Sequence, residues 1–264
     1  MNTLPRVLAP IVAATLEQLR RDRDAVSLTD LQRQIRTMPA VPSLQEALRR
    51  PGLQLIAEFK PRSPSRGVLR QGAEPSQFAK AYRPAAALSV LCDREHFGGG
   101  PHLLREFAGL TPQPLLAKGF FVDPYQLAQV RAHGAAAALL IARLLPGAQL
   151  AEMLQACGEL GLEALVEVHN HAEAELALAA GAEVVGVNAR DLDTLHIDLA
   201  ACRALLAQLP ASTCKVAESG VEQPSEVTVL RAMAAQGQVD AVLIGTAFMT
   251  AADPAAAVAG LGFA

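Results

Sequence analysis

The stretch EALVEVHNHAEAELALAAGAEVVGVN (163–188) has the pattern of a strand, a helix and a second strand. Its two ends, EALVEV (163–168) and EVVGVN (183–188), are short apolar runs of the length typical of buried strands. The segment between them, HAEAELALAAG (171–181), has apolar residues at helical spacing and ends on glycine, as helices often do. The stretch therefore predicts a βαβ unit with parallel strands.

The same pattern recurs along the whole chain. Eight apolar runs, each followed by a helix-like segment, read LQLIAEF, AALSVL, PLLAK, AALLIA, EALVEV, EVVGVN, CKVAES and DAVLIG. Right-handed βαβ units fit either an open doubly wound sheet or a closed (β/α)8 barrel. The count of eight and the length of 264 residues favour the barrel, and no GxGxxG motif lies in a first βα turn. We predict an α/β fold of the (β/α)8 TIM-barrel type.

Residues 1–50 precede the first predicted strand. Apolar residues at helical spacing between Val7 and Leu19 predict an amphipathic helix, and SLTDLQRQI (27–35) and SLQEALRR (43–50) predict shorter ones. A segment of this length is too small to hold a core alone. We expect a helical extension, residues 1–50, packed on a catalytic barrel of residues 51–264.

Composition and charge exclude several classes of protein. The chain is 51% hydrophobic and carries a net charge of −3, so its surface does not indicate nucleic-acid binding. Its four cysteines lie far apart without CxxC spacing, which supports neither a metal site nor a disulfide framework. The sequence has neither a signal-peptide layout nor an apolar run that could span a bilayer. We expect a cytoplasmic protein without membrane or nucleic-acid partners.

Charged residues gather at the carboxyl ends of the predicted strands, where (β/α)8 barrels carry their catalytic groups. In IAEFKPRSPSRG (56–67), Glu58 and Lys60 share one face of a strand because side chains alternate. Three further strands carry a charge at this end: Lys118, Glu167 and Glu218. If these faces point inward, three carboxylates and two ammonium groups converge on one cavity. Burial and mutual pairing there would shift pKa values toward acid–base work.

A less specific interpretation exists for each of these residues. A single Glu or Lys at a strand end is more often a solvated rim residue, but five such charges on four strands are better explained by an active site. Arg190 lies in a polar loop and could pair with Asp191 on the surface. The histidines show no metal-ligand spacing, so core or surface roles are expected for His169, His171 and His196.

Glycine-containing strand ends indicate a phosphate site. ESGV (218–221) and IGTA (244–247) close the seventh and eighth predicted strands. The loops after these two strands of a (β/α)8 barrel often bind phosphate through backbone N–H groups. The candidate phosphate-binding residues are Ser219, Gly220, Gly245 and Thr246.

With these motifs in place, the chain resembles the indole-3-glycerol phosphate synthase family from its N-terminal extension to its last helix. The motifs that carry the resemblance are IAEFKPRSPSRG, ALSVLCDREHFGGG, LLAKGFFVDPYQ, ALLIARLL, ALVEVH, GVNARDLDTLHID, VAESGV and LIGTAFM. The resemblance implies that 1-(2-carboxyphenylamino)-1-deoxyribulose 5-phosphate closes to an indole with loss of CO2 and water. It implies no metal and no organic cofactor.

The resemblance also implies roles for individual residues. Lys118 would be the general acid, Lys60 would pair with the anthranilate carboxylate, Glu167 would be the base for dehydration, and Glu58 would hold the lysines and stabilise positive charge. Other matched positions would contact the substrate hydroxyls or lie nearby: Asn188, Glu218, Arg190 and Ser63. The apolar wall around the aromatic ring would consist of Phe97, Leu139 and Leu192.

One departure from the family pattern lies next to the predicted acid. The family normally has Asp after the strand-end lysine, whereas this chain has Gly119. Alternation points position 119 away from Lys118, so a missing carboxylate there would act through the placement of the lysine. We hypothesise reduced turnover, which Gly119→Asp would test.

Two alternatives stay open. A phosphoribosylanthranilate isomerase would act on a related anthranilate sugar, but it would be expected to offer a Cys and Asp pair where this chain offers Lys and Glu. A non-catalytic or much weakened barrel of the same family would bind the ligand without turnover, and Gly119 is the feature that supports it. For either the ligand is a small anionic phosphorylated molecule, and we expect a monomer or weak oligomer.

Overall fold

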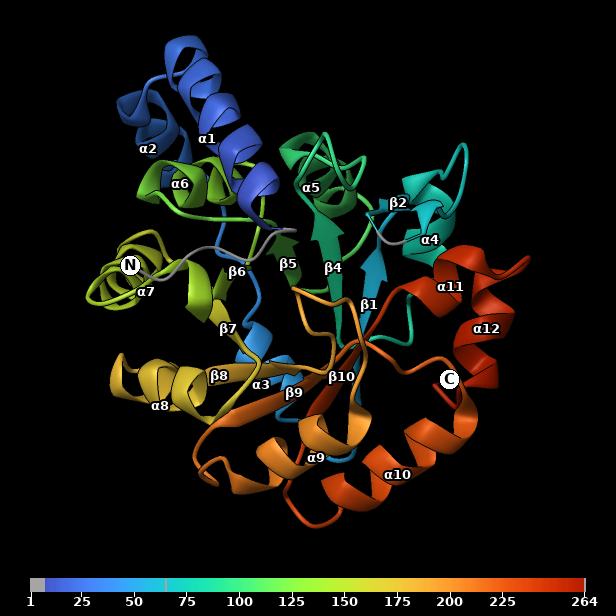
Figure 1. The fold of residues 1–264 in the computed structure, drawn as a ribbon. Coiled ribbons are helices and arrows are strands. Elements are labelled where there is room, and N and C mark those ends of the chain that lie inside the picture. The colour runs from blue at the N-terminus through green and yellow to red at the C-terminus, as the bar shows by residue number, and fades with distance from the viewer. Residues whose placement is uncertain (1–7, 65, 264) are drawn as a thin grey trace.

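A computed structural model describes residues 8–64 and 66–263. Residues 1–7 of the predicted extension, Ser65 of the IAEFKPRSPSRG motif and Ala264 lie outside the described residues. Within the described ranges, eight parallel strands close into a barrel that helices surround (Figure 1). The prediction of a (β/α)8 barrel is confirmed.

All eight predicted strands form. They are β1 (Gln54–Phe59), β4 (Ala87–Leu91), β5 (Leu115–Lys118), β6 (Ala137–Ile141), β7 (Glu163–Val168), β8 (Val184–Asn188), β9 (Cys214–Glu218) and β10 (Ala241–Ile244). Each pairs in parallel with the next along the chain, and β10 pairs with β1 to close the barrel. Because all strands run the same way, their carboxyl ends meet at one mouth.

Helices follow the strands on the outside of the barrel. They are α4 (Pro75–Ala81), α5 (Pro101–Ala108), α6 (Pro124–Ala132), the short 3-10 helix η1 (Ala142–Leu144) with α7 (Gln149–Glu159), α8 (His171–Ala179), α9 (Leu199–Gln208), α10 (Pro224–Ala234), α11 (Thr246–Thr250) and α12 (Pro254–Gly260). Their starts follow the sequence signals. Helix α6, for example, begins at Pro124 after Asp123, whose carboxylate accepts the N–H of Tyr125.

Three helices precede the barrel: α1 (Leu8–Ala25), α2 (Leu28–Arg36) and α3 (Leu44–Leu48). Helices α1 and α2 lie beside α6 (Figure 1), where the Tyr125 hydroxyl donates to the carbonyl oxygens of Asp22 and Val26. The Gln34 amide donates to the carbonyl of Ala132 on the same helix. Helix α3 lies near the amino ends of the strands, where Ser43 donates to Glu163 of β7.

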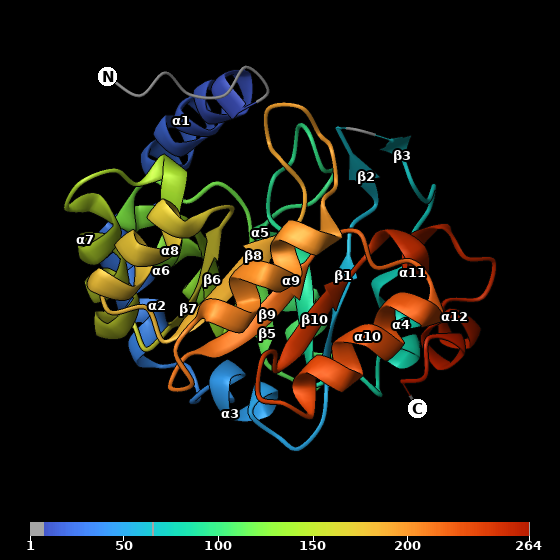
Figure 2. The ribbon, with the colours of Figure 1, turned by 60° about the horizontal axis from the view of Figure 1, so that its bottom comes forward.

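A small hairpin that the sequence reading did not predict follows β1. Strands β2 (Arg62–Ser63) and β3 (Gly67–Val68) pair antiparallel, within the stretch where the prolines and glycine had indicated only a break. The hairpin rises above the carboxyl end of β1, at the opposite end of the barrel from α3 (Figure 2). It therefore belongs to the rim of the mouth.

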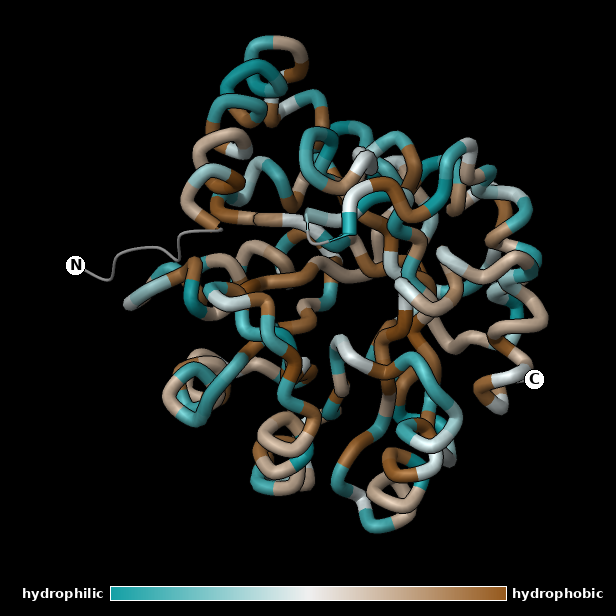
Figure 3. The backbone as a smooth tube through the Cα atoms, turned by 45° about the vertical axis from the view of Figure 1, so that its right-hand side comes forward, coloured by the Kyte–Doolittle hydropathy of each residue, from teal (hydrophilic) through white to brown (hydrophobic). Residues whose placement is uncertain are grey.

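The hydrophobic core fills the barrel and the layer between strands and helices. Hydrophobic segments concentrate along the strands and on the inward sides of the helices, while hydrophilic segments lie outside (Figure 3). In the part of the chain that the structure describes, no helix is both long and apolar enough to cross a membrane.

Candidate active site

Charged side chains from four strand ends meet inside the barrel mouth. Glu58, Glu167 and Glu218 are each buried, and Glu218 is fully inaccessible to solvent. Lys118 ends β5 with 16% of its side chain exposed, and Lys60 directly follows β1. Burying charges is costly unless they are paired, so their contacts decide whether this cluster is a site.

Four of these charges, those of Lys60, Glu58, Lys118 and Glu218, form a continuous chain of ion pairs. The ammonium of Lys118 lies 2.8 Å from Glu218 Oε2 and 3.4 Å from Glu58 Oε2. The other oxygen of Glu58, Oε1, lies 2.6 Å from the ammonium of Lys60. Glu58 therefore holds both lysines at once, and Lys118 lies between the carboxylates of β1 and β9, two strands that are separated only by β10.

The pKa values follow from this charge balance. Burial works against the ionised form of Glu58, but Lys60 and Lys118 outweigh it and lower the pKa of Glu58 to about 2. Burial likewise disfavours the ammonium of Lys118, yet the charges of Glu218, Glu58 and Glu167 raise the pKa of Lys118. Two lysines cannot neutralise three carboxylates. Burial and the charges of Glu167 and Glu58 accordingly exceed the effect of Lys118 and raise the pKa of Glu218 to about 7.

Two glycines make room for the buried carboxylates. A Cβ on Gly186 would lie 2.8 Å from Leu165 Cδ2 and 3.1 Å from Glu218 Cδ, with Glu218 Oε1 nearer still. A Cβ on Gly245 would lie 2.5 Å from Glu58 Oε1 and 2.9 Å from Glu58 Cβ. Real side chains do not tolerate such distances, so these strand positions are open only to glycine while the glutamates keep their places.

Glu167 is contacted by a residue for which the sequence had indicated no function. Its Oε1 lies 3.5 Å from Nε2 of His169, whose side chain is 5% exposed. The other ring nitrogen, Nδ1, lies 3.0 Å from Glu173 Oε2. The imidazole of His169 is thus buried next to Glu167, whereas the sequence had suggested only a core or surface role for this residue.

A pocket of about 420 Å³ opens beside the ion pairs, between the ends of β1, β9 and β10. It is lined by Lys60, Lys118 and Arg190 together with all four candidate phosphate residues, Ser219, Gly220, Gly245 and Thr246. Ser219 adopts a left-handed backbone with φ of 66°, a strained conformation that clusters at functional sites. Gly220 has φ of 82°, and a Cβ on it would lie 2.6 Å from Ile197. The loop after β9 therefore has little freedom in residue type.

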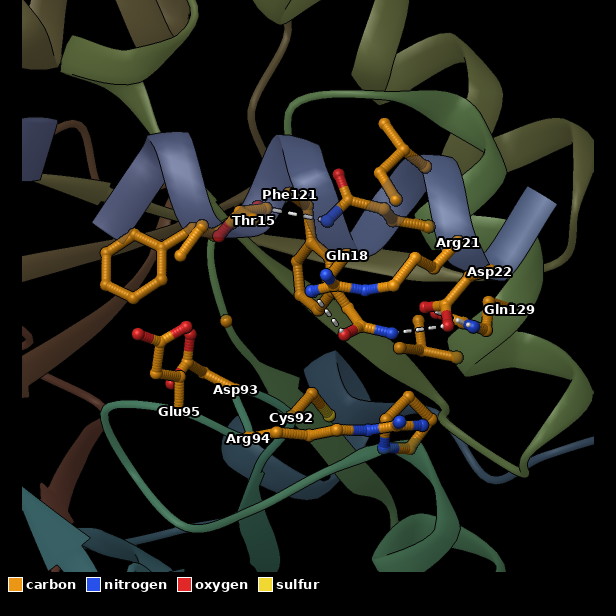
Figure 4. Close-up of a pocket in the computed structure, with 17 residues that line it drawn as sticks. Thr15, Gln18, Arg21, Asp22, Cys92, Asp93, Arg94, Glu95, Phe121 and Gln129 are labelled. Carbon is orange, nitrogen blue, oxygen red and sulfur yellow. Dashed lines mark hydrogen bonds between the residues drawn. The ribbon is translucent and has the colours of Figure 1, made fainter. Parts of the chain in front are cut away.

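A second pocket, of about 660 Å³, lies under α1 and contains none of the strand-end charges (Figure 4). On one side of this pocket, Gln18 of α1 accepts a hydrogen bond from Arg21 and donates one to Asp22 (Figure 4). On the other side lie three residues of the loop after β4: Cys92, Asp93 and Arg94. Gly119 lines this pocket, and a Cβ on it would meet Phe121 at 3.2 Å and Cys92 at 3.6 Å. Position 119 therefore points away from the mouth, as alternation predicted.

Comparison with known proteins decides the family. The family model described as indole-3-glycerol phosphate synthase matches residues 8–261. The chain belongs to the indole-3-glycerol phosphate synthase family. Relatives named indole-3-glycerol phosphate synthase from Mycobacterium sp. (strain KMS) and Mycobacterium tuberculosis (strain ATCC 25177 / H37Ra) are 41% identical over 259 residues, which cover 96% of this chain and 94% of theirs. The relative from Mycolicibacterium smegmatis is 40% identical over the same lengths.

Solved structures with low sequence identity share the fold. KGPDC from Streptococcus mutans superposes with a TM-score of 0.60 at 14% identity, covering 80% of this chain and 95% of that one. Thiamine phosphate pyrophosphorylase from Pyrococcus furiosus gives a TM-score of 0.57 at 16% identity, with coverages of 83% and 96%. At this identity the likeness concerns the barrel alone.

The stretch GVNARDL (186–192), at the end of β8, contains Asn188 and Arg190, two more of the predicted substrate residues. The side-chain oxygen of Asn188 accepts the backbone N–H of Arg190, and Arg190 donates to the carbonyl of Leu195. The surface pair of Arg190 with Asp191, considered from the sequence, does not form. Asp191 instead accepts the N–H groups of Asp193 and Thr194.

The residues predicted to form the apolar wall lie in three separate segments, and one of them contacts a further aromatic ring. Leu139 is buried in β6, and Leu192 is half-buried after β8. Phe97 lies in the loop after β4, and its ring centre is 6.0 Å from that of Phe120. Phe120 was not among the predicted residues of the indole-3-glycerol phosphate synthase site, although it immediately follows the KG pair in the quoted LLAKGFFVDPYQ motif.

Two side chains at the mouth were not predicted as site residues from the sequence, those of His169 and Ser89. The hydroxyl of Ser89, which pairs in register with Glu58, is buried without a hydrogen-bond partner among the described residues. Period-2 alternation in AALSVL could have indicated it, because a buried serine in an apolar strand must face some polar group. Ser63, which was predicted, donates no side-chain bond to the charges but accepts the N–H of Arg66 in the hairpin. No group of three or more metal-ligating side chains occurs in residues 8–64 and 66–263.

Proposed function

We propose that the chain catalyses the reaction after which its family is named. In it, 1-(2-carboxyphenylamino)-1-deoxyribulose 5-phosphate undergoes ring closure, decarboxylation and dehydration to indole-3-glycerol phosphate in tryptophan biosynthesis. The observation that carries this proposal is Lys118, a largely buried ammonium held between Glu58 and Glu218 beside a second ammonium, Lys60. This is a carboxy-lyase reaction on a small anionic phosphorylated substrate.

Substrate binding requires positive charge at both ends of the molecule. The pocket lined by Ser219, Gly220, Gly245 and Thr246 is assigned to the phosphate, with backbone N–H groups as donors. Lys60 lines the same pocket and is assigned to the substrate carboxylate. Its ammonium has three donors, and Glu58 takes one, so others are free for the ligand.

Ring closure needs an acid, because the aromatic carbon is a weak nucleophile and the attacked carbonyl becomes an alkoxide. We assign this acid to Lys118. Since its pKa is raised by neighbouring carboxylates against the effect of burial, it holds its proton when the substrate arrives. The proton passes to the carbonyl oxygen as the carbon–carbon bond forms. Glu58, which keeps its negative charge, stabilises the positive charge that develops on the substrate nitrogen.

The remaining steps remove CO2 and water. Loss of CO2 returns the electron pair of the broken carbon–carbon bond to the ring, which becomes aromatic again. The hydroxyl then leaves as water after taking a proton from an ammonium group, and Glu167 removes a proton from the carbon beside the nitrogen. These transfers are within the chemistry of lysine and glutamate side chains, so the proposal includes no metal and no organic cofactor.

Several further assignments belong to this proposal. Asn188, Arg190, Glu218 and Ser63 are assigned to the sugar part of the substrate and its surroundings. Phe97, Leu139 and Leu192 are assigned to the aromatic ring. Residues 1–50 would act as an extension of the barrel of residues 51–264, in a cytoplasmic monomer or weak oligomer. The non-catalytic alternative gains no support, because the ion pairs of Lys118 form with glycine at position 119.

The test is turnover of the named substrate by the purified protein. Indole fluorescence should rise, and mass spectrometry should find the product with one equivalent each of CO2 and water lost. The chain contains no tryptophan, so the product signal stands clear of the protein. Turnover of phosphoribosylanthranilate instead would favour the isomerase, and tight binding of the substrate without product would favour the non-catalytic barrel.

A further inference from the structure

His169 sits in a buried network that leads from the outer helices to Glu167. Its Nδ1 and its backbone N–H both contact Oε2 of Glu173, at 3.0 and 2.8 Å. The other oxygen of Glu173 receives Arg143 of η1, with Nε at 3.1 Å. Arg143 in turn lies 3.8 Å from Asp193 in the loop after β8. The imidazole is therefore held on one side only, by Glu173, and its other nitrogen is directed at Glu167.

That other nitrogen has no hydrogen bond in the described structure. Nε2 of His169 is buried and lies 3.5 Å from Glu167 Oε1, which is near but too far for a good hydrogen bond. A buried polar atom without a partner is costly and is rarely kept without a reason. Catalytic hydrogen bonds are often long in the free enzyme and shorten when the substrate is bound.

We propose that His169 is a positioning residue for Glu167: it donates from Nε2 to Oε1 in the substrate complex and holds this carboxylate in place for the final proton removal. The inference rests on the proposed function and adds a residue to it. Glu173 fixes which nitrogen faces Glu167, because its carboxylate accepts the Nδ1 proton. This is the arrangement of a base oriented by a third group.

The charges around His169 favour its protonated form. Burial and Arg143 lower the pKa of His169, but the hydrogen bond to Glu173 and the charges of Glu167 and Glu173 outweigh them and raise it. Burial likewise opposes the charge of Glu173, while His169 and Arg143 lower the pKa of Glu173. The charge of Glu167 also contributes to the raised pKa values of Lys118 and Glu218, which come from β5 and β9, each two strands away from β7 in the barrel. Loss of the imidazolium would remove the cation nearest to Glu167 on this side.

A simpler role for the same contacts is capping of α8. Asn170 caps this helix by accepting the N–H of Glu173, and Glu173 accepts the backbone N–H of His169. Both contacts use the backbone of residue 169 or other side chains. Substitutions of the imidazole therefore leave the cap in place, which separates the two roles.

The first test compares steady-state kinetics of His169→Asn, His169→Gln and the parent from pH 5 to 9. His171→Gln is the control, because His171 is exposed and lies only two residues further along the chain, at the start of α8. Asn can still reach Glu173 but not Glu167, whereas the longer Gln can place an amide donor near the position of Nε2. We expect His169→Asn to lower kcat about tenfold, within the roughly hundredfold that misplacement of a reacting group by 1 Å can cost.

Two further results would show that His169 acts by positioning Glu167. KM should stay within twofold, and His169→Gln should recover part of the rate. A kcat of His169→Asn within twofold of the parent would overturn the inference while leaving the proposed function intact. Failure of the parent itself to form product would overturn both.

A second measurement does not depend on activity. The pKa of His169, followed by NMR in the parent and in Glu167→Gln, should fall in the variant because Nε2 no longer faces a negative charge. An unchanged pKa of His169 would overturn the inference even if every variant at position 169 failed to fold.

Discussion

The substitution Gly186→Ala tests whether the buried ion pairs, rather than strand ends in general, carry the activity. Gly186 lies in β8 with its hydrogen atoms against Glu218 and Leu165, and it touches no part of the pocket assigned to the substrate. A methyl group there would lie 3.1 Å from Glu218 Cδ and 2.8 Å from Leu165 Cδ2. Carbon atoms pack best at about 3.5 to 4.0 Å, so both side chains must move by about 0.5 to 1 Å.

The expected loss of activity follows from the ion pair between Glu218 and Lys118. Its Oε2 is 2.8 Å from Lys118, and a movement of this size away from Gly186 breaks or lengthens that contact. We expect kcat to fall by about tenfold to a hundredfold, since misplacement of a reacting group by 1 Å can cost the larger factor. Overpacking should also cost about 1 to 3 kcal/mol of folding stability. That loss lowers the melting temperature by several degrees but leaves the protein folded at 25 °C.

The assay is initial-rate indole fluorescence at 25 °C together with thermal unfolding, and the control is Gly158→Ala. A Cβ on Gly158 of α7 meets nothing within 4 Å, so this variant should keep full activity and gain some stability, because alanine suits a helix better than glycine. Gly186→Ala with a kcat within twofold of the parent would refute the reasoning, since Glu218 would then tolerate displacement without consequence for Lys118.

Two further predictions concern the charge of Glu58 and the glycine at position 119, where the family normally has Asp. Glu58→Gln should flatten the acid side of the stability profile: the pKa of Glu58 is lowered from 4.5 to about 2, so its stabilisation is complete above pH 4.5 and is lost as pH falls toward 2. The free energy of unfolding, measured with urea at several pH values, should change less steeply with pH in the variant than in the parent, by up to about 1.4 kcal/mol per pH unit in this window. Equal slopes in the two proteins would contradict the lowered pKa of Glu58. Gly119→Asp should leave kcat within twofold, because position 119 faces the pocket under α1 and Lys118 already has two carboxylates. A gain of tenfold in the same fluorescence assay would instead support the hypothesis that Gly119 lowers turnover.

The barrel could be predicted from the sequence because its signals are local. Each strand is a short apolar run, and helices such as α6 begin at a proline and an aspartate that cap them. Alternation along β1 was enough to place Glu58 and Lys60 on one face, and the structure brings them within 2.6 Å of each other. Strand order then placed Lys118 and Glu218 at the same mouth.

The contacts that the sequence could not supply are those between distant segments. The sequence around Gly186 does not indicate that a glycine is needed there because any larger residue would collide with Glu218 on the neighbouring strand. The sequence suggested only a core or surface role for His169, because its contact with Glu173, which Arg143 also binds, depends on how separate segments of the chain come together. The hairpin β2–β3 was read as a break, since two-residue strands bounded by proline and glycine carry no periodic pattern.

The central claim is that Lys118, held between Glu58 and Glu218, supplies the proton for ring closure. The most direct measurement is the rate of indole formation by Lys118→Ala beside Lys80→Ala, with ligand binding followed by calorimetry. Lys80 lies exposed on α4 and serves as the matched control. The account predicts that Lys118→Ala still binds the substrate but loses about 10²- to 10⁴-fold in kcat, the usual contribution of a general acid, while Lys80→Ala matches the parent. A Lys118→Ala rate within tenfold of the parent would contradict it.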